Sequence, residues 1–422
     1  MFRASAAALL ATSMFVSPAL AADTSAETSA EQGETIVVTG QRQEYGVKAT
    51  STATKTNTDI KDIPQALTVI SESQIEDQQL RSIADVIYFV PGATPGTGES
   101  NRDQITLRGN STTADFFIDG IRDDVQYFRD LYNVERVEVL RGPNAMIFGR
   151  GGGGGIVNRV TKRTSLTPAR DLALSGDSWG GVRLTADLDH RLAPGAGARI
   201  NAMYEHGESF RRHVDLDRYA VNPTAGVLLG SRTRIDLGIE HLHDRRTADR
   251  GLPSLSGRPL KGFNRTFFGD PGASLARANV NIATAAVKRE LGTDLMLRNR
   301  TLFGDYDKFY QNVYPNGPVT DGLVKLSAYN DTFERRNLFS QTDLIWDSRL
   351  SGIDQTLLLG FELGSQKGRN QRRNGIFSAT GAGPTSIFVP VEDPTVDVPV
   401  TFLPNGANNA MRASVVAIYA QD

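Results

Sequence analysis

The sequence predicts a transmembrane antiparallel β-barrel preceded by a small α/β domain. Three observations carry this prediction. Apolar and polar residues alternate from position 170 onward, the connections between the alternating segments are alternately short and long, and a compact apolar region lies before them. Short turns at one end and long loops at the other are typical of membrane barrels, whereas a soluble sandwich has no reason to alternate.

The first residues have the features of a secretory signal peptide. Arg3 supplies a positive charge, positions 4–16 form a short apolar run, and Ala19-Leu20-Ala21 is a small-x-small cleavage site. We expect cleavage after Ala21, which gives a signal peptide over positions 1–21. No later stretch reaches the roughly 18 apolar residues that a membrane helix needs. The chain is therefore expected to be exported without a helical anchor.

The composition excludes several classes of protein. The chain has no cysteine, which rules out a disulfide framework, a cysteine-based zinc site and thiol catalysis. Its net charge of −2 gives no global basic surface for nucleic acid. The 41 glycines and the apolar content of 39% suit a strand-rich protein with many turns and a polar interior.

A polar extension over 22–58 follows the signal peptide, and it contains one segment of high strand propensity. Most of this extension is small, polar and Thr-rich, which is typical of disorder and of linkers. The exception is the run Thr35, Ile36, Val37, Val38 and Thr39, which ends at a glycine. Such a run can add as a strand to the sheet of another chain, or it can be the first strand of the next domain.

The compact region over 59–165 is expected to form the α/β domain. Ser71-Glu72-Ser73-Gln74 fits a capping box, and apolar residues from Ile75 to Ile87 form one helical face that ends at Pro91-Gly92. Four short strands are then expected at 104–107, 114–118, 134–140 and 156–160. About 100 residues are enough for such a domain to have its own core.

Ten alternating strands are expected over 170–422, the barrel region. Val182, Leu184, Ala186 and Leu188, for example, alternate with charged and hydroxyl side chains. The short connections are expected at 194–198, 230–232, 291–293 and 351–352. The longer ones are expected at 207–216, 244–276, 311–331 and 369–409, with a brief first loop at 177–181.

Ten strands are too few for a closed barrel that holds the preceding domain. An eight-stranded barrel has room only for side chains, whereas 22-stranded transporters hold a plug. An open half-barrel would leave unpaired strand edges in lipid, which costs several kcal/mol per unsatisfied group. We therefore expect this chain to be the N-terminal part of a longer protein with about 22 strands.

The motifs of the α/β domain resemble those of the TonB-dependent siderophore receptor family. They are Ile63-Pro64-Gln65-Ala66, Val90-Pro91-Gly92, Leu107-Arg108-Gly109, Phe117-Ile118-Asp119-Gly120 and the segments 134–143 and 148–158. The resemblance covers nearly all of the chain. It implies a plug domain over 59–165, a partial outer-membrane barrel over 170–422 and a TonB box over 35–39. The TonB box of this family pairs with the periplasmic protein TonB.

The resemblance also implies a function. The chain is expected to belong to a receptor that imports a ferric siderophore across the bacterial outer membrane, with energy transduced from the inner membrane. Haem, a cobalamin or an oligosaccharide are the alternative substrates. The expected partners are TonB, the ferric siderophore, outer-membrane lipid and lipopolysaccharide, and the protein is expected to be a monomer without a cofactor.

Two arginines of the plug are candidates for a latch. Arg108 and Arg141 stand in the Arg-Gly motifs, and in this family such arginines pair with glutamates of the barrel wall. The expected partners lie beyond the sequence given. A salt bridge within the plug is the alternative.

The chemistry of the ligand predicts which residues bind it. A ferric siderophore already saturates its iron, so the protein should offer aromatic rings and cations to a chelate that is often anionic. The candidates are plug and loop residues, namely Arg102, Arg122, Tyr127, Phe128, Arg245, Arg246 and Arg250. The third long loop also contains Phe263, Phe267 and Phe268. The alternative is that the loop arginines face lipopolysaccharide phosphates and the aromatic residues pack the loop.

Other motifs predict no catalysis and no metal site. The glycine run 149–155 contains a formal G-x-G-x-x-G, but a strand follows it where a dinucleotide site needs a helix. The glycines are better explained by tight passes of the backbone. His241 and His243 share one strand face, but two ligands do not complete a metal site. The chain is therefore not expected to be an enzyme.

Overall fold

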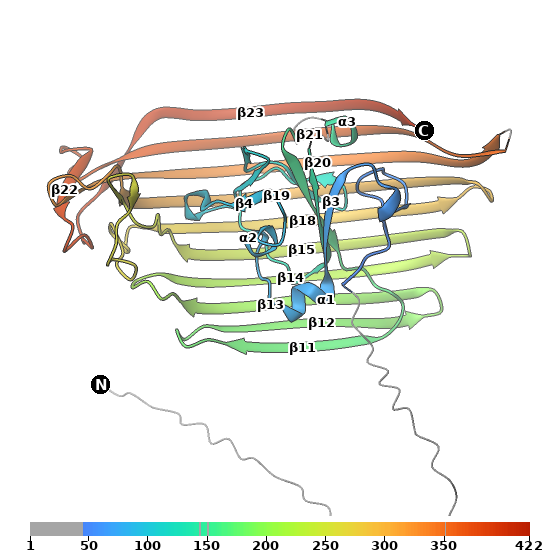
Figure 1. The fold of residues 1–422 in the computed structure, drawn as a ribbon, viewed down its shortest axis with the longest axis horizontal. Coiled ribbons are helices and arrows are strands. Elements are labelled where there is room, and N and C mark those ends of the chain that lie inside the picture. Colours follow the sequence, from blue (N-terminus) through green and yellow to red (C-terminus); the bar gives the residue numbers. More distant parts are fainter. Residues whose placement is uncertain (1–44, 143–144, 150–151, 351) are drawn as a thin grey trace, which may run out of the picture. The chain divides into compact units, whose positions relative to one another are not determined.

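The computed structural model describes residues 45–142, 145–149, 152–350 and 352–422 (Figure 1). The predicted signal peptide and the predicted TonB box lie outside these residues. Within the described ranges, no helix is long and apolar enough to cross a membrane.

The plug is built on a five-stranded sheet with the order β3-β9-β10-β7-β8. Its strands are β3 (Ala66–Ser71), β7 (Phe116–Ile118), β8 (Ile121–Arg122), β9 (Val134–Arg141) and β10 (Gly155–Thr161). The smaller elements are β1 (Ala49–Thr50), β2 (Thr58–Asp59), η1 (Ile60–Asp62), α1 (Glu72–Asp77), α2 (Ile83–Ile87), β4 (Ala93–Pro95), η2 (Gly98–Ser100), β5 (Ile105–Leu107), β6 (Asn110–Thr112) and α3 (Ala145–Phe148). Apolar residues of the two larger helices and of the sheet share one buried core.

The single helix predicted after Ser71 is wrong, because the chain forms two short helices. The Ser71 hydroxyl accepts a hydrogen bond from the Gln74 amide and caps α1. Gln79 then adopts a φ of 50°, which ends the helical path. The chain starts again at Ser82, where the Asp85 side chain closes a capping box and begins α2. The apolar period continues through the break, so it does not reveal the break.

Two glycines of the predicted tight passes stand where no side chain fits. A Cβ on Gly154 would lie 2.3 Å from the Leu107 carbonyl oxygen, and one on Gly155 would lie 2.2 Å from the Leu140 carbonyl oxygen. Here β10 begins against β9 and the end of β5. The glycines therefore serve close backbone packing.

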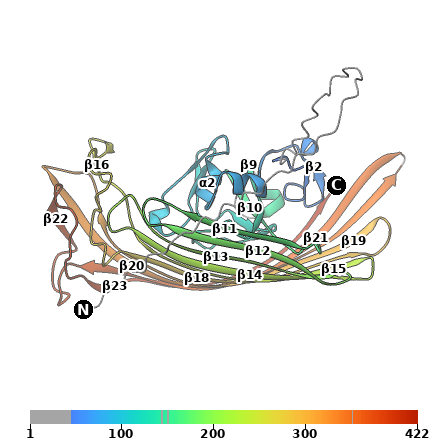
Figure 2. The ribbon, with the colours of Figure 1, turned by 90° about the horizontal axis from the view of Figure 1, so that it is seen from below.

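Ten long strands form one continuous antiparallel path, as predicted. They are β11 (Ala169–Gly176), β12 (Val182–Ala193), β13 (Ala196–Glu208), β14 (Asp215–Leu229), β15 (Thr233–Thr247), β18 (Leu275–Glu290), β19 (Leu295–Pro315), β20 (Leu323–Leu350), β21 (Ile353–Ile376) and β23 (Thr401–Gln421). The sheet is curved, and the plug lies on its concave side (Figure 2).

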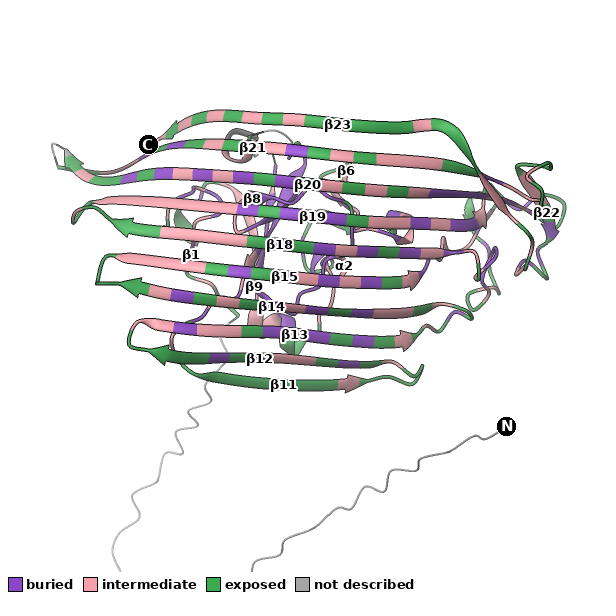
Figure 3. Ribbon diagram, turned by 180° about the vertical axis from the view of Figure 1, so that it is seen from behind, coloured by how far each residue is buried: buried purple, intermediate pink, exposed green. Residues whose placement is uncertain are grey.

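Exposed and buried residues alternate along these strands (Figure 3). In β12, Leu184 and Leu188 are exposed, whereas Arg183 and Asp187 are buried. The apolar side chains thus face outward and the charged ones face the plug, which is the reverse of a soluble protein. This is the arrangement that a barrel in lipid requires.

Two ends of the sheet differ in their connections. At the turn end the strands are joined at 194–195, 230–232, 291–294 and 351–352. At the loop end they are joined at 177–181, 209–214, 248–274, 316–322 and 377–400. The predicted long loop over 311–331 is therefore wrong. β19 and β20 continue well past the expected boundary, and β20 has 28 residues instead of about ten.

The outer loops pack on one another. β22 (Ser386–Pro390) pairs with the outer part of β20, and β16 (Ser254–Leu255) pairs with β17 (Arg258–Pro259). The Gly269 amide donates to the Pro394 carbonyl, and the Val396 amide donates to the Gly269 carbonyl. Phe268 and Val389 belong to one apolar cluster that joins the loops 248–274 and 377–400.

Candidate ligand cavity and plug contacts

A cavity of about 360 Å³ lies between the plug and the inner faces of β19, β20 and β21, towards the loop end. Its walls are mostly charged, amide and aromatic side chains: Glu99, Asn101, Arg102, Asp124, Gln126, Lys308, Tyr310, Tyr329, Asp331, Phe333, Arg335, Asn370 and Arg372. This volume lies within the range of small-molecule sites, and the lining is more polar than is usual for them.

The charges of this cavity are only partly neutralised. Arg102 pairs with Glu99 at 2.8 Å. Arg335 pairs with Asp124 at 3.1 Å. Among the described residues, Lys308 and Arg372 form no ion pair within 4.0 Å, although the Arg372 guanidinium lies 3.6 Å from the centroid of the Tyr329 ring. The cavity therefore offers an incoming group the basic side chains Lys308 and Arg372 beside tyrosine rings. It also holds the Asp331 carboxylate, which forms no ion pair within 4.0 Å among the described residues.

Glu99 holds the plug side of the cavity in place. It stands in η2 with a φ of 57°, and its main-chain carbonyl accepts a hydrogen bond from the Tyr310 hydroxyl at 2.8 Å. Burial alone would raise the pKa of the Glu99 carboxyl, but Arg102 and Arg250 outweigh burial and lower that pKa. Glu99 is thus ionised at neutral pH and orients both arginines.

One of the predicted ligand residues lines this cavity, and a second contacts its wall residue Glu99. Arg102 lines it. Arg250 stands behind it, with its guanidinium 3.4 Å from the Glu99 carboxylate and 4.5 Å from the centroid of the Tyr314 ring. Arg246 and Phe128 form a separate pair, because the Arg246 guanidinium lies 4.0 Å from the Phe128 ring centroid and also pairs with Asp244.

The other three predicted ligand residues are not brought to the cavity. Tyr127 is 2% exposed; its hydroxyl donates to Asp123 and accepts from Arg159 inside the plug. Arg122 is also buried, with its guanidinium over the Phe117 ring. Arg245 is exposed on the outer face of β15, because strand alternation turns it away from Asp244. The loop residues Phe267 and Phe268 are buried, as expected if they pack the loops.

The sequence reasoning missed the wall residues Lys308, Tyr310, Tyr329 and Arg372. A signal was present, because Tyr306, Lys308 and Tyr310 share one face of a strand. Tyr329 and Arg372 fell in the loops predicted over 311–331 and 369–409, whereas Lys308 and Tyr310 lay at the end of a predicted strand and were not singled out.

A second set of contacts fixes the plug to the first barrel strands. Arg183 of β12 donates two hydrogen bonds to the Asp130 carboxylate, at 2.8 and 2.9 Å. Arg218 of β14 lies 3.0 Å from the same carboxylate, and Glu205 of β13 accepts from both arginines. Burial alone would raise the pKa of Asp130, but Arg218 and Arg183 lower it to about 2.

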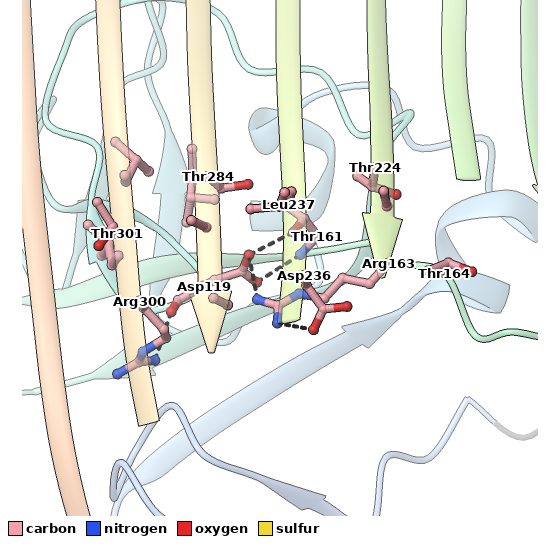
Figure 4. A pocket seen from close by; sticks show the side chains of 16 residues that line it. Asp119, Thr161, Arg163, Thr164, Thr224, Asp236, Leu237, Thr284, Arg300 and Thr301 are labelled. Carbon is pink, nitrogen blue, oxygen red and sulfur yellow. Dashed lines mark hydrogen bonds and ion pairs between the residues drawn. The ribbon is translucent and has the colours of Figure 1, made fainter. Parts of the chain in front are cut away.

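At the turn end, two cations of the plug lie beside carboxylates of the barrel wall. Lys162 Nζ lies 2.8 Å from the Asp187 carboxylate of β12. The Arg163 guanidinium lies between Asp119 of the plug, at 3.2 Å, and Asp236 of β15, at 3.6 Å (Figure 4). Beside them lies a cavity of about 30 Å³ lined by threonine hydroxyls, which is room for one or two waters.

The predicted latch arginines lie within the plug. Arg141 Nη1 donates to the Pro91 carbonyl at 2.7 Å. Arg108 adopts a φ of 48°, and its Nη1 lies 3.2 Å from the position that a Cβ on Gly142 would take. Neither arginine pairs with a barrel carboxylate among the described residues. Their role as a latch stays a prediction.

The two histidines of β15 are engaged by amides. His243 Nδ1 lies 2.6 Å from Asn279 Oδ1, and His241 Nδ1 lies 2.8 Å from Asn281 Oδ1. Within the described part of the chain, no group of three or more histidine, aspartate or glutamate side chains could hold a metal ion.

A plug seated in an antiparallel sheet of this kind defines a class of outer-membrane receptor. Residues 59–156 match the family model of the TonB-dependent Receptor Plug Domain. The chain therefore contains a TonB-dependent receptor plug domain ahead of its barrel strands, and its place is the bacterial outer membrane.

Curated relatives extend the likeness beyond the plug. The catecholate siderophore receptor Fiu of Escherichia coli K12 is 26% identical over 96% of this chain and 56% of its own length. The metal-pseudopaline receptor CntO of Pseudomonas aeruginosa PAO1 is 29% identical over 82% of this chain and 50% of its own length. This chain spans about half the length of the curated relatives that it matches. Such relatives are receptors, so the expectation that the chain is not an enzyme is confirmed.

Solved structures share the fold. The pyoverdine receptor FpvA of P. aeruginosa PAO1, bound to pyoverdine, has a TM-score of 0.79 at 18% identity, covering 89% of this chain and 56% of that one. The closed form of Fiu from E. coli K12 has a TM-score of 0.75 at 24% identity, covering 86% of this chain and 54% of that one.

Proposed function

We propose that this chain is part of a TonB-coupled receptor that imports a ferric siderophore through the outer membrane. The observation that carries the proposal is the loop-end cavity, where Lys308 and Arg372 lie beside Tyr310 and Tyr329 and form no ion pair with any carboxylate that the structure describes. The names of the relatives, a catecholate siderophore receptor and a pyoverdine receptor, support the same class of ligand.

The chemistry of the cavity favours an anionic chelate with aromatic rings. Guanidinium and ammonium groups attract negative charge, and tyrosine rings pack against planar ligand rings. The iron needs no protein ligand, because the chelate saturates it. A ferric catecholate fits this combination of groups better than an uncharged hydroxamate does.

The plug contacts support a transport mechanism in which the seated plug closes the barrel. Displacing the plug means separating the ion pairs of Asp130 and Lys162 from the wall, and buried ion pairs are costly to separate. An external source of energy is therefore expected, and we assign the segment Thr35 to Thr39 as the TonB box through which that energy acts.

The ligand part of this proposal is tested by replacing the two basic side chains of the cavity, Lys308 and Arg372. In the full-length protein, Lys308→Gln with Arg372→Gln should weaken the binding of a ferric tris-catecholate to whole cells at least tenfold. The matched control is Arg336→Gln with Arg369→Gln, which removes two charges from the outer faces of β20 and β21. Equal binding by both double variants would refute the assignment of the cavity.

The energy-coupling part is tested by Val37→Pro. Proline removes a main-chain donor and should prevent strand pairing with TonB. Uptake of the iron-55 chelate should fall to the level of cells without TonB, while surface binding should stay unchanged. Unchanged uptake would refute the assignment of the TonB box.

If the full-length protein supports growth only when haem or cobalamin is supplied, and not with a ferric siderophore, the other substrates are favoured.

A further inference from the structure

One carboxylate of the loop-end cavity stands apart from the ion pairs that the described residues form. Asp331 lies half-buried on the inner face of β20 and lines the cavity. Among the described residues it forms no ion pair within 4.0 Å. The other two carboxylates of the cavity differ from it. Glu99 pairs with Arg102, at 2.8 Å. Asp124 pairs with Arg335, at 3.1 Å. The Asp331 carboxylate thus stays available to an incoming group.

The strand register places Asp331 between an aromatic ring and a guanidinium group. Tyr310 of β19 is directly opposite it on one side, and Arg372 of β21 is directly opposite it on the other. Side chains that face each other across neighbouring strands have Cβ atoms about 5 Å apart, so Arg372 could pair with the carboxylate. Its guanidinium lies instead 3.6 Å from the centroid of the Tyr329 ring. The two opposite charges are thus kept apart although their strands are neighbours.

Lys308 is a second basic side chain near this carboxylate. It is two residues from Tyr310 on the same face of β19, which makes it a diagonal neighbour of Asp331, and such neighbours are about 7–8 Å apart. Lys308 and Arg372 act on the carboxylate electrostatically, and the Asn370 amide is its hydrogen-bonding neighbour. One carboxylate and two basic side chains therefore share a small patch of the wall.

The charges of this patch restrict which anions the cavity accepts. The basic side chains attract a negatively charged chelate, whereas the Asp331 carboxylate repels it from the same place. This repulsion is offset when the ligand itself carries a positive group that lies against the carboxylate. Tyr310 and Phe333, which line the cavity on either side of Asp331, favour such a group, because aromatic rings attract ammonium ions.

We propose that Asp331 is a specificity-determining residue, which selects among anionic ferric chelates those that carry a protonated amine close to the iron centre. This inference rests on the proposed function of the cavity and adds a requirement to it. The amine has to lie within about 7–8 Å of the negative groups of the chelate, because that is the spacing of neighbouring side chains across the patch. A chelate without the amine leaves the repulsion of Asp331 in place and binds more weakly.

The test compares two synthetic ferric tris-catecholates that differ in one group, a primary amine on a short arm that is either free or acetylated. The full-length wild-type protein, purified in detergent, should bind the chelate with the free amine at least fivefold more tightly than the acetylated one. Asp331→Asn should bind both chelates equally, because its amide carries no charge. Asp331→Glu should keep a preference for the free amine, because it restores the carboxylate.

Asp307→Asn is the matched control, because it removes an exposed carboxylate from the outer face of β19. This variant should keep the full preference for the free amine. The inference is overturned if wild type binds both chelates equally, if Asp331→Asn keeps the preference, or if Asp307→Asn loses it as well. In these three cases both chelates still bind, and the proposed function stands. If wild type binds neither chelate, the proposed function is overturned together with the inference.

Discussion

The plug meets the barrel wall with opposite signs of charge at its two ends. Towards the loop end, plug carboxylates face wall arginines, as Asp130 faces Arg183 and Arg218. Towards the turn end, plug cations face wall carboxylates, as Lys162 faces Asp187. Each end has one exception. At the loop end the plug residue Arg81 pairs with Glu205, and at the turn end Arg199 of β13 lies 3.8 Å from Glu72 of the plug.

This reversal of charge explains how a single position of the plug inside the barrel is favoured over others. If the plug moved along the barrel axis towards the turns, its carboxylates would approach wall carboxylates, and like charges repel strongly where water is scarce. Buried ion pairs contribute little net stability compared with apolar packing, but they penalise wrong arrangements. The two ends together fix the height of the plug.

Asp130→Asn should remove the ion pairs between plug and wall at the loop end, and we expect it to lower the stability of the plug the most. The change leaves two buried guanidinium groups with only Glu205, and removing one partner of a buried pair typically costs about 3–5 kcal/mol. In the full-length protein, urea should unfold the plug at a clearly lower concentration, and planar bilayers should show more open-channel events. Asp217→Asn, an exposed change, is the control, and an equal effect there would contradict the role of Asp130.

Acid should weaken the loop end through the same residue. The pKa of the Asp130 carboxyl is about 2 in the folded protein, below its ordinary value of 3.8. The ionised carboxylate therefore stabilises the seated plug fully above about pH 4. That stabilisation, about 2 kcal/mol, is lost as the pH falls towards 2. Urea midpoints measured at pH 6, 4 and 3 should show the loss in wild type, and Asp130→Asn should remove this component.

Lys162→Met should break the turn end with a smaller effect. Lys162 also pairs with Glu72 of the plug, and Asp187 keeps a second partner in Arg199 at 2.6 Å. We expect a loss of about 1.5 kcal/mol in the urea unfolding of the plug. A loss as large as that of Asp130→Asn would show that the two ends contribute equally.

Tyr306→Phe removes a single hydrogen bond between wall and plug, and we expect it to lower the stability of the plug the least. The Tyr306 hydroxyl of β19 donates to Asp123 at 3.1 Å, and Asp123 keeps ion pairs with Arg129 and Arg159. The loss should be about 1 kcal/mol, because one hydrogen bond is removed while the ring stays packed. A gain in stability would mean that the hydroxyl is not bonded as described.

The sequence predicts the barrel wall well because strand alternation is a local signal. Leu184 and Leu188 face outward, and Arg183 and Asp187 face inward, as their spacing requires. The same rule locates residues wrongly when a strand end is misjudged. Arg245 looks like a loop residue because β15 was expected to end before it, whereas the strand continues to Thr247.

Sequence spacing cannot reveal which plug residues reach the cavity. Both Tyr127 and Arg102 are suited to contact a ligand, yet Tyr127 is buried and bonded to Asp123 and Arg159, and these contacts are set by the folding of the whole plug. The break between α1 and α2 was missed for a related reason. The capping box of Ser82 and Asp85 starts a new helix within one turn, while the spacing of the apolar residues continues unchanged across the break.

The packing of the outer loops has a consequence for how fast a ligand is captured. Because the loops 248–274 and 377–400 share one apolar cluster and main-chain bonds, the entrance above the cavity behaves as a standing funnel rather than as separate lids. Capture by such a funnel depends on its width and on the electric field of its walls, and it slows as salt screens that field. The proposed anionic chelate should thus be captured more slowly as the ionic strength rises.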